Sequence, residues 1–368
     1  GGGVFHQVVD RRRAVAAALQ VSDPAPQEVR VEALPNPVEV LDGAPQQGPR
    51  VGLAGDGEVA PVPKVLDLGP KHPHAERVER GQRQPRPGLT DSIKSGLAVP
   101  ILSDEAIFDL VLPGHPSLAE AYAEYTGYPL DDRDNLPRIA KFCKLNRQRE
   151  AVQTGGDFTH NDLRADFCDF VKNFIYAQAE AHGADADLLA EAEARFAATT
   201  VTGFAGLLGY PRFDRGADDP LQVLANLPFR VLLTTSPYTF LEAALTKAGK
   251  TPRSTVIRWR PDLRDLIDPR IADVPAGREP GDFPLVCHLF GLESTSSSLV
   301  LTEDDYLEFL VDVNLGRGDD KRDSVPAQVR KALSGDLLVL GFSLNSWAFR
   351  ALYAGLIRSD DARAEKHR

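Results

Sequence analysis

The sequence predicts an α/β fold in which a parallel β-sheet is covered by helices on both faces. Two features of the chain indicate this class. Short apolar segments of strand length alternate with longer segments whose apolar residues follow helical spacing. The strand-length segments are apolar along their whole length, which is typical of parallel sheets because helices cover both of their faces.

Five segments are expected to form the sheet, and a sixth has a strand-like start. All but the first fall after residue 228. The five expected strands are residues 95–102, 229–235, 254–259, 284–291 and 337–343, and the strand-like start is residues 298–301. Ligands in such sheets bind beyond the carboxyl ends of the strands, so the candidate site lies where the first, second, fourth and fifth strands end.

Helices are predicted from apolar spacing and from residues that begin or end a helix. Ser117 and Glu120 match a capping box, and Thr302 precedes three acidic residues that favour a helix N-terminus. Gly183 and Gly249 stand where helices are expected to end. The expected helices are residues 117–129, 240–249, 302–313, 325–336 and 346–357, with a mainly helical stretch at about 136–209.

The first 88 residues differ in composition and in apolar patterning from the rest of the chain. They are rich in Pro, Gly, Gln, Val and Arg, and prolines bound each short alternating segment. Methionine is absent from all 368 residues, position 1 included. We therefore expect residues 1–88 to be a disordered or non-native extension and residues 89–358 to form the α/β domain, with a helical insertion at about 135–210. Residues 359–368 are expected to be a tail, at which the sheet ends or the natural protein continues.

Charge and cysteine content exclude several classes of function. The net charge of −11 argues against broad binding to nucleic acids or anionic membranes, which needs a basic face. Cys143, Cys168 and Cys287 lie far apart and form no CxxC pair, so they predict neither a zinc site nor a disulfide framework. No apolar run reaches the length of a membrane span. We expect a cytoplasmic protein with reduced thiols that binds no nucleic acid and no membrane.

One loop contains side chains of the kinds that bind metals. Asp157, His160 and Asp162 lie within six residues of each other in the segment GGDFTHND. Because no fourth ligand follows at helical spacing, the start of a helix is the favoured interpretation, and we expect no metal site.

Three segments together resemble those of bacterial sirtuin-like domains. LLTTSPYTFLEAAL, residues 232–245, resembles that family's TTNYD-x-LLE segment. VCHLFGLESTSSSLVLTEDDYLEFL, residues 286–310, resembles a segment with a His-Gly pair followed by an acidic helix start. LLVLGFSLNSWAFRALYAGLI, residues 337–357, resembles the LLFLGYSLxDWxFRxLLxxL segment.

The resemblance covers about residues 92–357 and carries expectations about fold and activity. It implies a Rossmann-like, doubly wound parallel sheet with a helical insertion. In active members of the family it also implies binding and hydrolysis of NAD, often within anti-phage defence.

The family's glycine-rich loop after the first strand is replaced in this chain. Where the family has Gly-Ala-Gly-x-Ser, this sequence has Ser103, Asp104 and Glu105. Two carboxylates then stand where phosphates would lie, and their charge would repel a dinucleotide. Ser103 is expected to cap a helix, with nucleotide binding as the alternative role.

The turn after the second strand also lacks the family's polar pair. Ser236 stands in place of the Asn that positions water or ribose, and Tyr238 stands in place of the Asp that holds the nucleotide. A hydroxyl cannot reproduce the paired donor and acceptor of an amide. The favoured structural interpretation is that Thr235 or Ser236 caps the following helix, with Pro237 in its first turn.

A third replacement affects the family's catalytic base, the His that precedes Gly. Here that position is Phe290, while His288 lies two residues earlier and is expected on the same strand face. A structural histidine is the favoured interpretation, although His288 is the best titrating candidate in the chain. The turn Gly341-Phe342-Ser343 matches the family's "GYS" turn, which in active relatives lies against the nucleotide.

The resemblance and the three replacements together predict a pseudoenzyme in a prokaryotic defence or signalling protein. It would act as a nucleotide-sensing or protein-interaction module, with NAD or ADP-ribose as ligand and a protein partner or a fused effector or sensor domain. The alternative is an active NAD hydrolase that releases nicotinamide from a rearranged site. The site residues of that alternative are Ser236 and His288 for catalysis and Ser103, Thr235, Gly341, Phe342 and Ser343 for the cofactor.

Overall fold

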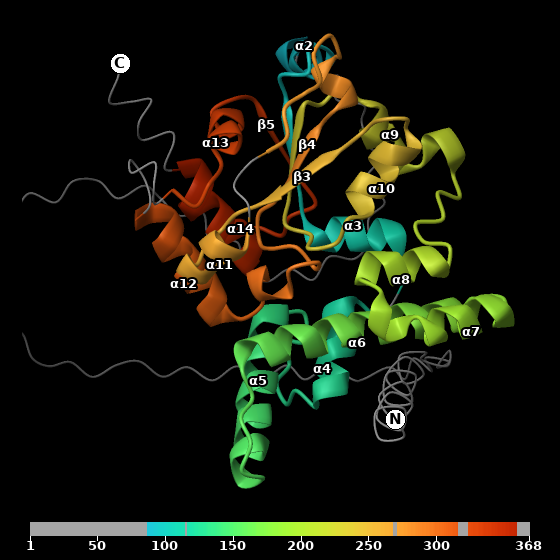
Figure 1. The fold of residues 1–368 in the computed structure, drawn as a ribbon, viewed down its shortest axis with the longest axis vertical. Coiled ribbons are helices and arrows are strands. Elements are labelled where there is room, and N and C mark those ends of the chain that lie inside the picture. The colour runs from blue at the N-terminus through green and yellow to red at the C-terminus, as the bar shows by residue number, and fades with distance from the viewer. Residues whose placement is uncertain (1–86, 115, 268–270, 316–322, 359–368) are drawn as a thin grey trace, which may run out of the picture. The chain divides into compact units, whose positions relative to one another are not determined.

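A five-stranded sheet forms the centre of the computed structural model, which describes residues 87–114, 116–267, 271–315 and 323–358 (Figure 1). All strand pairs are parallel, and the strand order is β3-β4-β2-β1-β5. The sheet is doubly wound and Rossmann-like, as predicted. Its strands are Val99–Leu102 (β1), Val231–Thr234 (β2), Arg253–Val256 (β3), Leu285–His288 (β4) and Leu337–Leu340 (β5).

The two faces of the sheet belong to separate hydrophobic cores. Ile101, Leu233 and Cys287 align across three neighbouring strands and are buried in one core. The next row along the same strands, Leu102, Thr234 and His288, is buried on the other face. Apolar residues on both faces explain why the strands were recognisable as continuous apolar runs.

Two groups of helices cover these faces, as Figure 1 shows. The face that buries Leu102, Thr234 and His288 carries α3 (Asp104–Val111), α9 (Pro220–Asn226) and α10 (Phe240–Lys247). The face that buries Ile101, Leu233 and Cys287 carries α11, α12, α13 and α14. The bounds of this second group are Pro261–Leu266 (α11), Glu303–Leu315 (α12), Ala327–Leu333 (α13) and Trp347–Leu352 (α14), with a π-helical turn at Tyr353–Ile357 (η5).

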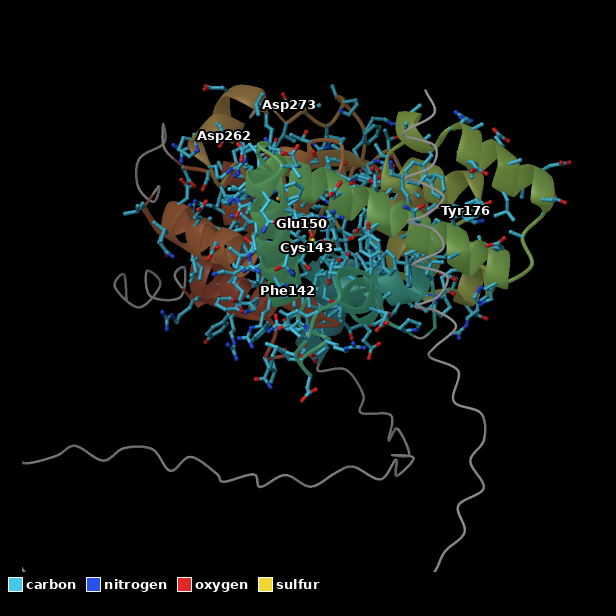
Figure 2. All side chains as sticks on the ribbon, turned by 90° about the horizontal axis from the view of Figure 1, so that it is seen from below. Phe142, Cys143, Glu150, Tyr176, Asp262 and Asp273 are labelled. Carbon is cyan, nitrogen blue, oxygen red and sulfur yellow. The ribbon has the colours of Figure 1, made fainter. Side chains whose placement is uncertain are left out.

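Between β1 and β2 the chain forms a helical segment that lies beyond the carboxyl ends of the strands (Figure 1). Four of its helices fall within the stretch expected to be helical. The segment consists of α4 (Leu118–Thr126), α5 (Leu136–Gln153), α6 (His160–Ala181), α7 (Ala186–Ala194) and α8 (Val201–Leu207), with short 3-10 turns at Phe196–Ala198 (η1) and Gly216–Asp218 (η2). Figure 2 views the molecule from this side, where Phe142, Cys143 and Glu150 mark α5.

Several predicted helix starts and helix ends are confirmed. Ser117 and Glu120 form the expected capping box at the start of α4. Thr159 and Asp162 form another at the start of α6, so the helix-start interpretation of that loop is confirmed. Gly183 and Gly249 adopt positive φ angles of 73° and 78° just after α6 and α10, the conformation that ends a helix.

The expectation of a strand-like start at residues 298–301 is wrong. Ser298 ends a 3-10 turn at Ser296–Ser298 (η4), residues 299–301 form no strand, and the Val300 amide donates to the Phe290 carbonyl at 2.9 Å. A helix, α2 (Pro87–Lys94), precedes β1 and includes the last two residues of the predicted extension. Residues 1–86 and 359–368, and with them most of the predicted extension and the whole tail, lie outside the described residues.

Ion pairs of the first turn of α12 connect the sheet domain to the helical segment. Its three successive carboxylates, residues 303–305 (the acidic turn), each pair with a different cation of α5 or α6. The pairs are Arg138–Glu303 at 3.3 Å, Lys141–Asp304 at 2.8 Å and Arg164–Asp305 at 2.8 Å. Only the last pair is buried, with side-chain exposures of 1% and 2%. No helix among the described residues is long and apolar enough to cross a membrane.

Candidate functional site

A cavity of about 610 Å³ lies beyond the carboxyl ends of the strands. The turns after β1, β2, β4 and β5 form its floor, and α4, α5 and α6 of the helical segment contribute to its walls. This is where open α/β sheets bind ligands, and the volume is in the usual range for ligand pockets. Of the residues predicted for the site, Thr235 and Ser343 line this cavity.

The N-terminus of α3 borders the cavity, and two of its amides are bound by the protein's own hydroxyls. The Ser103 Oγ accepts from the Ala106 amide at 3.0 Å, which confirms its predicted role as a helix cap. The Thr235 Oγ1 accepts from the Asp104 amide at 2.9 Å. The expectation that Thr235 caps the helix after its own strand is therefore wrong, because it caps α3, which follows a neighbouring strand.

Gly341 serves close packing against α3. Its φ angle is +77°, and a Cβ added there would overlap the Ala106 side chain and come within 2.9 Å of the Ser103 Oγ. The Ser103 hydroxyl also donates to the Gly341 carbonyl at 2.6 Å. The neighbouring Phe342 packs on Phe349 at a ring distance of 6.1 Å. Of this turn, only Ser343 is in the lining of the cavity.

Ser236 is fully buried within the turn after β2. Its amide donates to the Thr234 Oγ1 at 3.0 Å, and its hydroxyl accepts from the Tyr238 amide at 3.4 Å. The helix that follows starts only at Phe240, so Ser236 does not cap it and Pro237 is not in its first turn. The chain winds through a side-chain-stabilised turn before α10, and this turn withdraws Ser236 from the cavity lining.

His288 is fully buried between a carbonyl and a carboxylate. Its Nδ1 lies 2.7 Å from the Ser236 carbonyl oxygen, and its Nε2 lies 2.8 Å from Glu242 Oε1. Since a carbonyl oxygen can only accept, Nδ1 carries a proton. Burial lowers the pKa of the imidazole, but the charge and hydrogen bond of Glu242 outweigh burial and hold that pKa above its ordinary value.

Glu242 completes this buried pair from α10. Burial raises the pKa of its carboxyl, but the charge and hydrogen bond of His288 bring the pKa below its ordinary value. The Ser254 hydroxyl also donates to Glu242 Oε1 at 2.7 Å. His288 and Glu242 therefore favour each other's charged form, and His288 has the contacts of a structural histidine. The role of Ser236 and His288 in catalysis stays a prediction, and neither residue lines the cavity.

The expectation that His288 and Phe290 share one face is wrong. His288 faces α10, whereas Phe290 packs on Tyr306 and Phe309 of α12 at ring distances of 5.1 and 5.0 Å. Strand β4 ends at His288, and the chain turns at the two residues that follow, so the alternation of a strand no longer applies.

Tyr238, which replaces the family's Asp, belongs to the hydrophobic core. The side chain is 1% exposed and packs on Phe108 and Phe240 at ring distances of 5.9 and 5.6 Å. An aromatic ring thus fills the space between α3 and α10, and no carboxylate faces the cavity from this position.

The charges around the cavity are predominantly negative. Two cationic side chains, Arg138 and Arg350, line it, and Arg138 is already paired with Asp132 at 2.7 Å. The lining carboxylates are Asp104, Glu105, Asp109, Asp132 and Asp134.

Asp104 is the most perturbed of these carboxylates. The residue is half-buried, yet its Oδ1 is fully buried and has no hydrogen-bond partner among the described residues. Burial raises the pKa of this carboxyl to about 7, the Ser236 hydroxyl opposes the shift, and the charges of Glu105 and Asp109 add to it. An uncompensated buried carboxylate oxygen is costly, so this position would gain from a positively charged neighbour.

These residues do not fit the phosphates of a dinucleotide. Phosphates bind helix N-termini through free backbone amides and the positive end of the helix dipole. At α3, Ser103 and Thr235 occupy two of these amides, and the carboxylates of Asp104 and Glu105 stand in the first turn. Anionic phosphates would meet negative charge in a partly buried setting, where repulsion is stronger than in water.

Several residues of this region escaped the sequence analysis. Glu242 gave only a weak signal, as one carboxylate among the apolar residues of α10. Glu293 gave none, because its carboxylate accepts from the Thr202 amide of α8, 91 residues away, at 3.1 and 3.2 Å. Long-range partners of this kind have no local sequence pattern. Among the described residues, no group of three or more His, Cys, Asp or Glu side chains is arranged to hold a metal ion.

Comparison with known proteins finds a similarity over the C-terminal part of the chain. The profile of the SIR2-like domain matches residues 230–368, a range that includes β2 to β5 and the turns after them. The match does not extend to β1 or to the helical segment. A search of curated proteins found no significant match.

Proposed function

The chain carries a SIR2-like domain, and from this premise we propose that it is a binding module that does not hydrolyse NAD. Sirtuin-like domains are related to NAD, so the question is whether this one can hold the dinucleotide. The observation that supports our proposal best is the N-terminus of α3, where Ser103 and Thr235 bind two of the amides and the carboxyl groups of Asp104 and Glu105 stand in the first turn.

The positions of Ser236 and His288 support the same proposal. For either side chain to reach a substrate in the cavity, the turn after β2 would have to open and the buried pair with Glu242 would have to separate. Breaking a buried, hydrogen-bonded ion pair costs about 3–5 kcal/mol. The raised pKa of His288 also favours its protonated form, which cannot act as a general base.

The cavity itself supports a role in binding. It keeps the place and volume of a ligand site, and the acidic turn holds the helical segment over it. We infer that the domain senses a ligand or contacts a partner through this region. Use of the module in a prokaryotic defence or signalling system is the part of the proposal that rests on the family resemblance alone.

Release of nicotinamide from NAD tests this proposal. The purified full chain is incubated with NAD at pH 7 and pH 8, and nicotinamide is quantified by chromatography against a protein-free control. We expect no release above the control at either pH. Release by the wild-type chain that disappears in the His288→Gln and Ser236→Ala variants would overturn the proposal and establish the NAD hydrolase.

A further inference from the structure

Aromatic side chains form one wall of the cavity. Phe290, Tyr306 and Trp347 all line it, and the Tyr306 and Trp347 rings stack at 6.2 Å with an interplanar angle of 28°. The edge-to-face contact of Phe290 with Tyr306 fixes this arrangement further. The faces of such rings carry partial negative charge and attract cations, most strongly where water is excluded.

The acidic groups of α3 face the same space as these rings. Burial raises the pKa of the Tyr306 hydroxyl, and the negative charges of Glu105 and Asp104 raise it further, so α3 and α12 act on each other across the cavity. Asp104 lines the cavity on this side, and its buried Oδ1 has no hydrogen-bond partner among the described residues. Two cationic side chains line the cavity. Arg350 of α14 is the one that forms no ion pair among the described residues.

We propose that this cavity binds a small organic cation, an alkylammonium group, through the Asp104 carboxylate and the aromatic wall of Tyr306 and Trp347. The inference rests on the proposed function, since it assigns the ligand of the same non-hydrolysing site. A cation would compensate the buried carboxylate oxygen, and the apolar chain of an alkylammonium would cover the aromatic surface. A metal ion fits less well, because the described carboxylates do not converge as a ligand group.

The affinity of such a cation should depend on pH. With a pKa of about 7, Asp104 is ionised to roughly a tenth at pH 6 and nine tenths at pH 8, so binding should strengthen about tenfold between them. The negative charges of Glu105 and Asp109, on the same helix, raise the pKa of Asp104. The charge of Asp104 in turn raises the pKa of the Tyr238 and Tyr306 hydroxyls.

Calorimetric titration with n-butylammonium chloride tests the proposal, with sodium chloride at equal ionic strength as reference. At pH 8 we expect n-butylammonium to bind the full chain saturably. Its affinity for the Asp104→Asn variant should be about tenfold lower, because that variant loses one charge interaction. Asp187→Asn is the matched control, because Asp187 lies in the first turn of α7 and does not line the cavity. This control should bind like the wild type.

A second variant tests whether weaker binding reflects the loss of a contact or a loss of folded protein. Trp347→Leu removes part of the aromatic wall and leaves the carboxylates in place, and it should also weaken n-butylammonium while the far-ultraviolet circular dichroism stays unchanged. Equal binding by the wild type, Asp104→Asn and Trp347→Leu would overturn the inference. Tighter binding of ADP-ribose than of n-butylammonium would overturn it as well.

The outcomes separate this inference from the proposed function. Nicotinamide release would overturn the proposed function, whereas absence of ammonium binding without nicotinamide release would overturn this inference alone. A tripeptide with blocked ends and a central lysine distinguishes the source of the cation. Tighter binding of the peptide than of n-butylammonium supports a protein side chain as ligand, and weaker binding supports a free amine.

Discussion

His288 and Glu242 form a buried ion pair that ties β4 to α10, and its stabilising effect has a defined pH range. The pKa of His288 is raised on folding, so its contribution is complete below the ordinary value of 6.5 and is lost as pH rises through the folded value. The pKa of Glu242 is lowered, so its contribution is lost as pH falls below the ordinary value of 4.5. The pair therefore stabilises the fold most between about pH 4.5 and 6.5.

Replacing Glu242 by Gln should destabilise the protein most within that range. Because the change leaves His288 buried without its counter-charge, we expect a loss of about 3 kcal/mol at pH 6 and a smaller loss at pH 9. Urea unfolding at the two pH values measures the difference. Glu150→Gln, which removes an exposed pair with Arg147, should change stability by less than about 1 kcal/mol. Equal effects of the two substitutions would contradict the assignment of an ion pair to His288.

Gly341 offers a second test at single-residue scale. Gly341 and Gly249 have φ angles of +77° and +78°, but a Cβ has open space at Gly249 and meets α3 at Gly341. Both alanine variants carry the backbone strain of about 1–2 kcal/mol. Gly341→Ala should cost about 1–3 kcal/mol more, because it also forces α3 away from β5. Similar melting temperatures for the two variants would show that the close approach at Gly341 does not exist in solution.

At the scale of elements, the acidic turn of α12 decides how the helical segment is held over the cavity. Asp305 is buried, receives the Leu301 and Thr302 amides at 3.0 and 2.9 Å, and pairs with Arg164. Asp304 is half-buried, with 41% of its side chain exposed, and its ion pair is with Lys141. Adjacent residues with the same side chain therefore have very different environments.

Asparagine at each of these two positions should separate the buried pair from the partly exposed one. Asp305→Asn leaves the Arg164 guanidinium buried without its counter-charge, so we expect a loss of about 3–5 kcal/mol in unfolding free energy. Asp304→Asn should lose about 0–1 kcal/mol. Chemical unfolding measures both, and faster proteolysis between α4 and α6 in Asp305→Asn would show that the segment itself has loosened. If Asp304→Asn were the more damaging variant, the acidic turn would not hold the segment through Arg164.

Local signals explain which elements the sequence predicts correctly. Strands buried on both faces appear in the sequence as apolar runs. The capping box at Ser117 and the glycines that end α6 and α10 can likewise be predicted, because each signal lies within a few residues of the sequence. Contacts between distant segments decide the rest. Thr235 caps α3 across 131 residues, and the end of β4 at His288 follows from the turn that comes after it. The sequence therefore predicts where the site lies, while tertiary contacts determine which side chains reach it.

Among the described residues, the sheet and a cavity beyond its carboxyl ends are present, while the residues beside that cavity do not suit the phosphates of a dinucleotide. The hydroxyls of Ser103 and Thr235 close the start of α3, Tyr238 joins the core, and His288 belongs to an ion pair. The Tyr238 ring packs on Phe108 and Phe240, while its buried hydroxyl has no hydrogen-bond partner among the described residues. The net charge of −11 adds a long-range term that also disfavours anionic ligands.

Calorimetric titration of NAD into the full chain tests the loss of the dinucleotide site most directly. We expect no saturable heat at NAD concentrations up to about 1 mM, a limit that corresponds to about 4 kcal/mol of binding free energy. Saturable binding in the micromolar range, weakened by changes at Ser103 or Thr235, would contradict the view that these hydroxyls and the carboxylate of Asp104 have closed the phosphate site.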